Sequence, residues 1–239
     1  WLYGGKNRAG ATDPAFNDSS FESVTLPHTN VVLPWHSFDD KAYEFVSIYR
    51  RHFQLPAELR ASRVFVDFGG VMTAATVWIN GKRLGAYRGG YTPFSFDLTP
   101  HLNWKGDNVL AVEVDSTERQ DIPPFGHQID YLTFGGIYRD VQLRCVNSMW
   151  IENVFAQPVN VLRDNRSLKV RVYLQGSTVT SKKITAELRD GERVIASSSQ
   201  NIKEVEPPFY ELELTNLGNI ELWDTQRPRL YNVRVTLSE

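Results

Sequence analysis

Apolar and polar residues alternate with a period of two along most of the chain, and the longer period of an amphipathic helix is missing. The alternation is clearest over residues 64–68, 110–114 and 141–145. Each of these segments is typical of a β-strand with one face turned inward, and in the last of them Val141, Leu143 and Cys145 form that face. The pattern therefore predicts an all-β protein.

Two dipeptides between alternating segments predict β-hairpins. Asn80-Gly81 and Asp190-Gly191 each separate two apolar runs of strand length. Residues of these types tolerate the positive φ angles of a type I′ turn, whose twist matches that of the flanking strands. We expect a turn of this kind at both positions.

The spacing of the predicted strands changes near residue 147. Before it, long loops rich in Gly, Pro and aromatic residues separate the strands, as at 89–93 and 122–126. After it, strands follow at the short, regular spacing of a small immunoglobulin-like sandwich, although the Cys–Trp–Cys pattern of true immunoglobulin domains is absent. A length of 239 residues suits two domains. We expect one domain over 1–147 and a second over 148–239.

The composition of the chain argues against two classes of binding partner, nucleic acids and membranes. The net charge of −2 provides no basic field for nucleic acid. No apolar run approaches the roughly 20 residues that span a bilayer, so no membrane partner is expected. The first residues lack the basic and apolar segments of a signal peptide, and the chain has no initiator Met, so we expect a processed or trimmed fragment. The compartment is left open, with a periplasmic or secreted parent as the hypothesis.

Cysteine and histidine provide no metal centre. The single cysteine, Cys145, excludes a disulfide within the chain and a multi-cysteine zinc site, and its apolar alternation predicts a buried, unreactive thiol. The five histidines, at positions 28, 36, 52, 101 and 127, do not have metal-ligand spacing. We expect neither a metal nor a cofactor.

Several motifs, in order along the chain, resemble the N-terminal region of glycoside hydrolase family 2, which includes β-galactosidases, β-glucuronidases and β-mannosidases. They are Leu-Pro-His-Thr at 26–29, Tyr-Arg-Arg-His-Phe at 49–53, Val-Trp-Ile-Asn-Gly-Lys at 77–82, Gly-Gly-Tyr-Thr-Pro-Phe at 89–94, Phe-Asp-Leu-Thr at 96–99 and the run 130–141 ending in Phe-Gly-Gly-Ile-Tyr-Arg-Asp-Val. Near the end, Leu222-Trp223, Pro228 and Leu230-Tyr231 resemble the last strands of the family's second domain, where Trp223 is expected to pack in the core or at a domain junction.

The resemblance implies a jelly-roll, galactose-binding-like β-sandwich followed by an immunoglobulin-like β-sandwich. In the family a (β/α)8 barrel with two catalytic glutamates comes next, and we expect that barrel to begin where this chain stops. The resemblance thus implies a non-catalytic N-terminal portion of a β-galactosidase-like enzyme that supports the barrel and contributes to carbohydrate recognition.

Three residues are candidates for sugar binding, and none is a candidate for catalysis. Asp130 matches an aspartate that reaches into the active-site mouth of resembling enzymes, and its carboxylate can accept two sugar hydroxyls. The alternative for Asp130 is a structural carboxylate that accepts loop backbone N–H groups. His127 shares its loop, and Tyr91 lies in an open, Gly-rich loop where a ring can stack on a sugar.

Two other functions stay open on the residues alone. One is a stand-alone carbohydrate-binding module that tethers a partner to a glycan. The other is a structural pair of sandwiches at an oligomer interface, since a homo-oligomer is compatible with the sequence. For the preferred function, the partner is a β-glycoside substrate bound together with the missing barrel.

Overall fold

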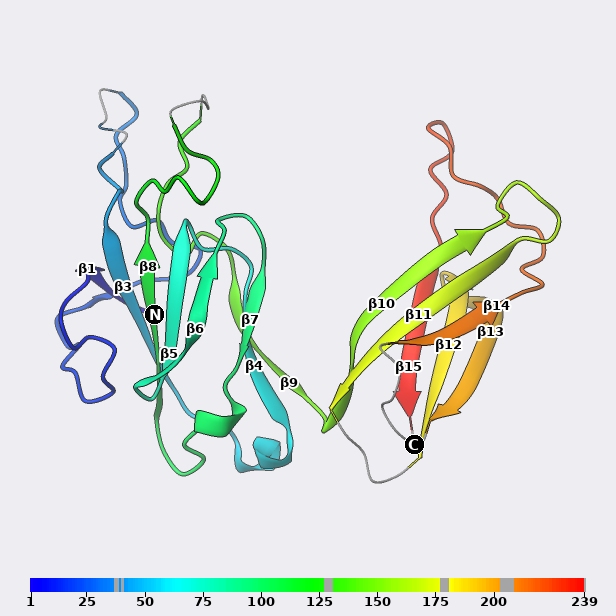
Figure 1. Ribbon diagram of the computed structural model, residues 1–239, viewed down its shortest axis with the longest axis horizontal. Helices are drawn as coiled ribbons and strands as arrows, with labels where there is room; N and C mark the ends of the chain where they lie inside the picture. Colours follow the sequence, from blue (N-terminus) through cyan, green and yellow to red (C-terminus); the bar gives the residue numbers. More distant parts are fainter. Residues whose placement is uncertain (37–38, 40, 127–130, 177–180, 203–208, 239) are drawn as a thin grey trace. The chain divides into compact units, whose positions relative to one another are not determined.

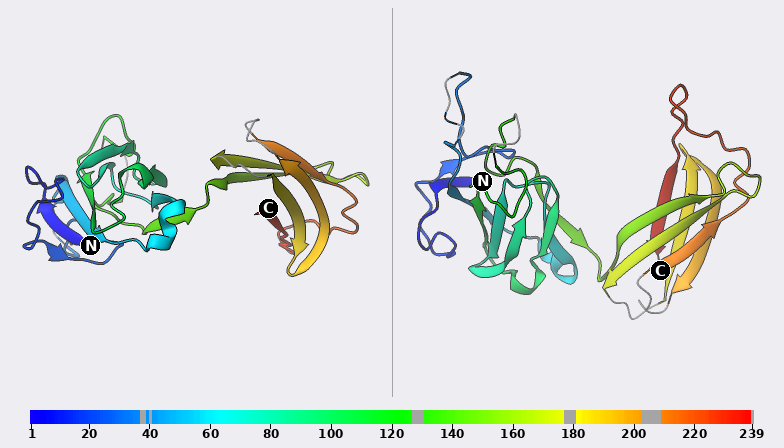
Figure 2. Two further views of the ribbon diagram at one scale, coloured as in Figure 1. Left: turned by 90° about the horizontal axis from the view of Figure 1, so that it is seen from below. Right: turned by 45° about the horizontal axis from the view of Figure 1, so that its top comes forward.

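The computed structural model describes residues 1–239 except 37–38, 40, 127–130, 177–180, 203–208 and 239. It is 48% strand and 4% helix, which confirms the predicted all-β class. None of the helices in the described ranges is long and apolar enough to cross a membrane. Residue contacts divide the chain into two compact units, Trp1–Cys145 and Val146–Glu239 (Figures 1 and 2).

The first unit is a sandwich of two antiparallel sheets. Its described elements are β1 (Leu2–Lys6), β2 (Glu22–Ser23), β3 (Val46–Phe53), η1 (Ala57–Ala61), β4 (Arg63–Phe68), β5 (Ala74–Ile79), β6 (Lys82–Arg88), β7 (Phe94–Asp97), η2 (Thr99–His101), β8 (Asn108–Asp115) and β9 (Val141–Val146). One sheet has the order β2-β1-β3-β8-β5-β6 and the other the order β7-β4-β9 (Figure 1).

The core of the first unit lies between these sheets and follows the period-two pattern. Val64, Val66 and Phe68 of β4 are at most 1% exposed, and they belong to one apolar cluster with Val77 of β5 and Val112 of β8. Because alternate side chains of a strand point to opposite faces, the alternation assigns one face of each strand to this core.

The second unit is a smaller sandwich of two three-stranded sheets. Its described strands are β10 (Met149–Val159), β11 (Ser167–Gly176), β12 (Lys182–Asp190), β13 (Arg193–Ile202), β14 (Tyr210–Leu214) and β15 (Asn232–Ser238). The sheet orders are β10-β11-β14 and β13-β12-β15. Val170 and Val172 of the first sheet and Ile184 and Ala186 of the second are completely buried in a common apolar core.

Both predicted hairpins are present, but their turns differ. Asn80 and Gly81 have φ angles of 50° and 76° between β5 and β6, as a type I′ turn requires. In the second hairpin Asp190 pairs with Arg193, so the turn residues are Gly191 and Glu192, one position later than predicted. Only the glycine has a positive φ there, which fits a type II′ turn.

Two apolar positions that were expected inside lie at the surface. Leu143 is 41% exposed and Cys145 is an exposed free thiol, although Val141 on the same face of β9 packs against the core. The reason is that β9 is an edge strand, where alternation persists but the opposing sheet does not cover the whole inward face. Trp223 in the second unit is 57% exposed, so it does not pack in the core of that unit, and its position at a domain junction stays a prediction.

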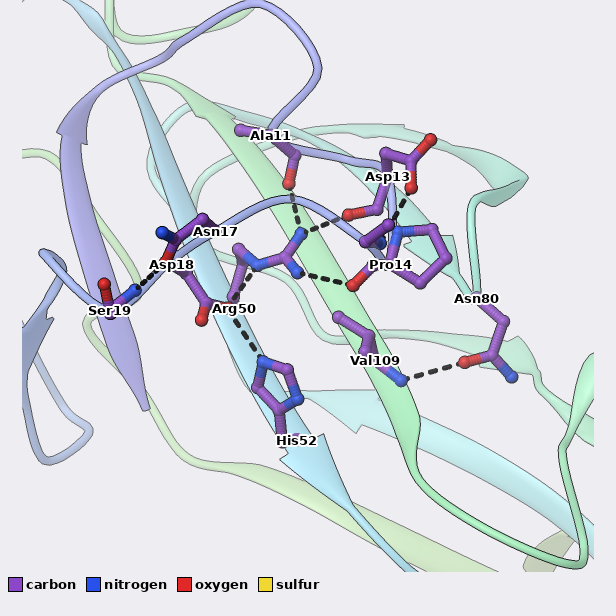
Figure 3. A network of polar contacts seen from close by, with 11 residues as sticks. Ala11, Asp13, Pro14, Asn17, Asp18, Ser19, Arg50, His52, Asn80 and Val109 are labelled. Carbon is purple, nitrogen blue, oxygen red and sulfur yellow. Dashed lines mark hydrogen bonds and ion pairs between the residues drawn. The ribbon is translucent and has the colours of Figure 1, made fainter.

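A buried arginine anchors the long loop over residues 7–21 to the larger sheet of the first unit. Arg50 of β3 is fully buried and donates a hydrogen bond from Nε to Asp18 at 2.6 Å (Figure 3). Its other nitrogens donate to the carbonyl oxygens of Ala11, Asp13 and Pro14. A buried guanidinium is tolerated only when its donors are satisfied, so this loop and β3 must be positioned together.

Asp18 makes the stability of this anchor dependent on pH. Although burial opposes its ionisation, hydrogen bonds from His52 and Arg50 hold the pKa of the Asp18 carboxyl below its usual value. A lowered folded-state pKa stabilises the fold above the unfolded-state value of about 3.9, and that contribution disappears as the pH falls further. Asp18→Asn should lower the free energy of unfolding by about 2 kcal/mol at pH 7, and by progressively less below about pH 4.

Urea unfolding of the chain and of Asp18→Asn between pH 7 and pH 3 measures this effect. Asp13→Asn is the matched control, because its side chain lies in the same loop and accepts a hydrogen bond from the N–H of Ala15. A difference between the Asp18 variant and the original chain that stays constant with pH would contradict the prediction.

Candidate functional site

The candidate site lies where loops of the first unit meet at one end of its sandwich. The loop between β6 and β7 carries Tyr91, and the segment that leads into β9 carries Tyr131, Thr133 and Phe134. Two of the three predicted binding residues, His127 and Asp130, are outside the described residues, and the third is Tyr91. Of the three candidates, the structure therefore describes Tyr91 alone.

Tyr91 lies in a group of tyrosines. Its ring is 41% exposed, and its hydroxyl donates to the hydroxyl of Tyr131 at 3.5 Å. The ring packs edge-on against Tyr138, whose own hydroxyl donates to the carbonyl oxygen of Gly90. Burial and the hydrogen bond with Tyr131 raise the pKa of Tyr91 well above its usual value, so the hydroxyl is protonated and able to donate at neutral pH.

Backbone hydrogen bonds fix the position of the segment that carries Tyr131. The N–H groups of His28 and Asn30 donate to the carbonyl oxygens of Ile137 and Gly135, at 2.8 and 3.2 Å. On the other side, Gly136 exchanges hydrogen bonds with Met72 at 3.0 and 3.3 Å. Two sequence motifs that are more than 100 positions apart are thus held side by side by direct backbone hydrogen bonds.

The two glycines of this segment allow the close approach. A Cβ atom on Gly135 would lie 2.5 Å from the side-chain oxygens of Asn30 and Ser116. Gly136 has a φ of 103°, and a Cβ atom there would lie 2.7 Å from the carbonyl oxygen of His28. A side chain at position 135 would displace the buried polar groups of Asn30 and Ser116, and one at position 136 would meet the backbone in a conformation that favours glycine.

Asn30 is the polar side chain at the inner end of this arrangement. It is 6% exposed, and its Nδ2 donates to the carbonyl oxygen of Tyr43 at 2.8 Å. Its Oδ1 is buried and has no hydrogen-bond partner among the described residues. The Tyr43 hydroxyl is hydrogen-bonded to Thr133 at 3.1 Å, which connects the Asn30 segment to the loop of Tyr131.

A small polar cavity opens beside these residues. Its lining includes Tyr43, Glu44, Glu118, Tyr131 and Thr133. Its volume of about 90 Å³ is well below the roughly 300 Å³ at the lower limit of ligand pockets. This cavity is therefore too small to enclose a sugar ring.

Electrostatics do not favour acid catalysis at these loops. The Asp121 carboxylate is paired with Arg88 at 2.9 Å and with Arg119 at 3.1 Å, and the hydrogen bond from Arg119 lowers its pKa. All the carboxyl pKa shifts resolved in the described residues are downward, whereas a glycosidase acid needs a raised pKa. In the same ranges, no group of three or more His, Cys, Asp or Glu side chains could hold a metal ion.

Family comparison accounts for both units. Residues 10–147 match the family model for the sugar binding domain of glycosyl hydrolases family 2, and residues 150–239 match a second model, glycosyl hydrolases family 2. The chain belongs to glycoside hydrolase family 2. It comprises the N-terminal sugar-binding domain and the immunoglobulin-like domain that follows it.

Individual relatives are much longer than this chain. The β-galactosidase of Thermoanaerobacter pseudethanolicus is 38% identical over 99% of the chain, which spans 32% of that protein. A β-glucuronidase of Formosa agariphila is 29% identical over the whole chain, which spans 27% of its length. The solved β-glucuronidase of Bacteroides uniformis is 31% identical, with a TM-score of 0.86 over 99% of the chain and 29% of that structure. The chain thus spans about a third of these proteins.

Among the described residues at this end, the sequence suggested Tyr91 as a sugar-binding candidate, which stays a prediction, and did not suggest the residues that surround it. Asn30 directly follows the motif at 26–29, and Tyr131 and Thr133 lie inside the motif at 130–141. The sequence signal that could have indicated these residues is their position inside or next to motifs that resemble the family. Their grouping depends on the pairing of 28–30 with 135–137, which no local pattern encodes.

Gly136→Ala tests whether close backbone packing holds this end of the sandwich. We expect the free energy of unfolding to fall by about 2 kcal/mol or more, because alanine is strained at this φ and its Cβ meets a backbone carbonyl. Gly5→Ala is the control in the same unit, since Gly5 also has a positive φ, of 65°, but has open space around its Cβ position. Chemical denaturation measures both, and equal losses would contradict the close-packing account.

Proposed function

We propose that this chain is the non-catalytic N-terminal portion of a β-galactosidase-like exo-glycosidase. The supporting observation is the 38% identity to a β-galactosidase over nearly the whole chain, with about two thirds of that relative lying outside the match. Catalysis by this class of enzyme needs an acid of raised pKa and a second carboxylate about 5–9 Å away on a rigid frame. In our proposal both belong to a barrel outside this chain.

In this proposal the loop end of the first unit forms one wall of the substrate site. Exposed aromatic rings gather there, with Tyr91, Phe125, Tyr131 and Phe134 each between 41% and 54% exposed. Aromatic faces bind the apolar faces of sugar rings, and a protonated tyrosine hydroxyl can donate to a sugar oxygen. Asp130 would add a carboxylate that orients the sugar, with His127 beside it.

The substrate class is proposed as β-galactosides. A β-glucuronide is the second candidate, because the solved structure with a TM-score of 0.86 is a β-glucuronidase. A stand-alone carbohydrate-binding module remains the alternative from another class. Measurable sugar affinity of this chain by calorimetry would favour that alternative, because a single wall binds weakly without the rest of its pocket.

Activity assays separate these functions. We expect no turnover when the purified chain is incubated with nitrophenyl β-galactoside, β-glucuronide or β-mannoside, because the catalytic carboxylates are absent. The full-length enzyme should turn over the β-galactoside fastest. Turnover by the chain alone that is abolished by mutating one of its acidic residues would contradict the proposal. Preference of the full-length enzyme for the β-glucuronide would reassign the substrate.

Asp130→Ala in the full-length enzyme tests the proposed wall. We expect kcat/KM to fall by about 100-fold or more, because a lost charged hydrogen bond costs about 1.5–3 kcal/mol and misplacement of the sugar adds to this. Asp121→Ala is the control, since its carboxylate is occupied by Arg88 and Arg119. An unchanged kcat/KM for the Asp130 variant would contradict the proposal and indicate that Asp130 only stabilises its loop.

A further inference from the structure

The loop between β6 and β7, over residues 89–93, has no regular structure that would place its side chains. It begins with Gly89 and Gly90, and Gly89 has a φ of 143°, a conformation that other residues rarely adopt. Glycine permits many backbone conformations, so the local sequence does not fix where the next residue, Tyr91, lies. A ring that binds a ligand must be held in one place, so contacts with other segments have to position it.

The segment that leads into β9 provides these contacts. The Tyr91 hydroxyl donates to Tyr131 at 3.5 Å, and the Tyr91 ring packs edge-on against Tyr138 with its centre 6.5 Å away. The Tyr138 hydroxyl donates to the carbonyl oxygen of Gly90. Nη1 of Arg139 donates to the carbonyl oxygen of Tyr91 at 3.1 Å. This last bond holds the backbone of Tyr91, whereas the others hold its side chain or the residue before it.

Arg139 is itself fixed by two further contacts. The same Nη1 donates to the carbonyl oxygen of Gly69, directly after β4, at 3.4 Å. The guanidinium carbon lies 5.4 Å from the centre of the Tyr138 ring, and a cation is attracted to the face of an aromatic ring. Hydrogen bonds from an ionised donor are stronger than those from a neutral one. A single side chain thus joins the end of β4 to the loop that carries Tyr91.

Two glycines after β4 make room for this arrangement. A Cβ atom on Gly70 would lie 2.9 Å from the hydroxyl oxygen of Tyr138 and 3.0 Å from Cδ of Arg139. A Cβ atom on Gly69 would lie 3.1 Å from Cβ of Arg139. The N–H of Gly69 donates to the carbonyl oxygen of Asp140 at 2.9 Å, which fixes the backbone next to Arg139. Close packing of this kind leaves the two side chains little freedom to move.

The position of Arg139 indicates that it acts through Tyr91. Arg139 does not line the small polar cavity to which Tyr131 contributes. It lines a separate depression, together with residues that include Pro27 and Pro93. A ligand at the cavity would therefore meet the tyrosines and not the guanidinium.

We propose that Arg139 is a positioning residue of the proposed sugar wall, where it fixes the place of the Tyr91 ring together with Tyr138. The inference deepens the proposed function and rests on it, since Tyr91 is a binding residue only in that proposal. Without the guanidinium, the carbonyl oxygen of Tyr91 loses a charged donor and the glycine-rich loop samples other positions. The sugar then binds more weakly, while bond cleavage by the carboxylates of the barrel changes little.

Kinetics of the full-length enzyme test this role. Arg139→Gln should raise KM for a β-galactoside about tenfold and change kcat by less than about threefold, because the lost interaction is shared by the bound substrate and the transition state. Arg144→Gln is the matched control, since Arg144 of β9 also packs on an aromatic ring, that of Phe65 at 4.7 Å, and it should leave both constants unchanged. A fall in kcat with an unchanged KM would overturn the inference.

A double-mutant cycle separates positioning from a general loss of structure. Tyr91→Ala should raise KM, and adding Arg139→Gln to it should change KM by less than about twofold further, because the ring through which Arg139 acts is already absent. Tyr138→Phe keeps the ring beneath the guanidinium and loses the bond to Gly90, so it should follow the same pattern with a smaller rise, and it provides the test if Arg139→Gln does not fold. Fully additive effects on KM would overturn the inference.

Nuclear magnetic resonance of this chain tests the positioning without any activity. A nuclear Overhauser effect should connect the ring protons of Tyr91 and Tyr138, and Arg139→Gln should abolish it. The effect between the stacked rings of Phe68 and Phe94 in the core is the internal control and should persist. An unchanged effect between the two tyrosines would overturn the inference. An inactive full-length enzyme would contradict the proposed function, and this comparison would still decide whether Arg139 positions Tyr91.

Discussion

The face-to-face packing of two sheets is the interaction on which the rest of this molecule depends. In the first unit it buries one face of β4, β5 and β8 almost completely, and in the second it buries one face of β11 and β12. A sandwich satisfies its apolar faces in this way but leaves two kinds of surface unsatisfied, namely its strand ends and its sheet edges. The candidate functional site lies at the strand ends of the first unit.

The loops at the candidate site keep their position through backbone and buried polar contacts. The segment at 135–137 lies between 28–30 and Met72, and the absence of side chains on Gly135 and Gly136 makes this possible. Arg50 has the same role elsewhere in the unit, where one buried guanidinium gathers carbonyl groups of a loop that has no regular structure of its own. A binding wall that contributes only part of a pocket must be rigid, because misplacement weakens the orientation of the ligand.

The charges of the first unit agree with an accessory role. Asp67, Asp97 and Asp121 each accept hydrogen bonds from an arginine, and each pKa is lowered. Carboxylates held in this way stabilise loops and strands and stay ionised, so they suit architecture and not proton transfer.

By itself the sequence determined the all-β class, the positions of the main strands, the hairpin at Asn80-Gly81 and the family, because period-two alternation, turn chemistry and ordered motifs are local properties of the chain.

Tertiary structure alone decided which apolar faces are covered. Leu143 and Cys145 have the alternation of buried residues and are exposed, since coverage depends on which strand lies opposite. Tertiary structure also decided that Asn30, Tyr43, Tyr91 and Tyr131 share one end of a sandwich, because pairing between 28–30 and 135–137 joins segments that no local signal connects.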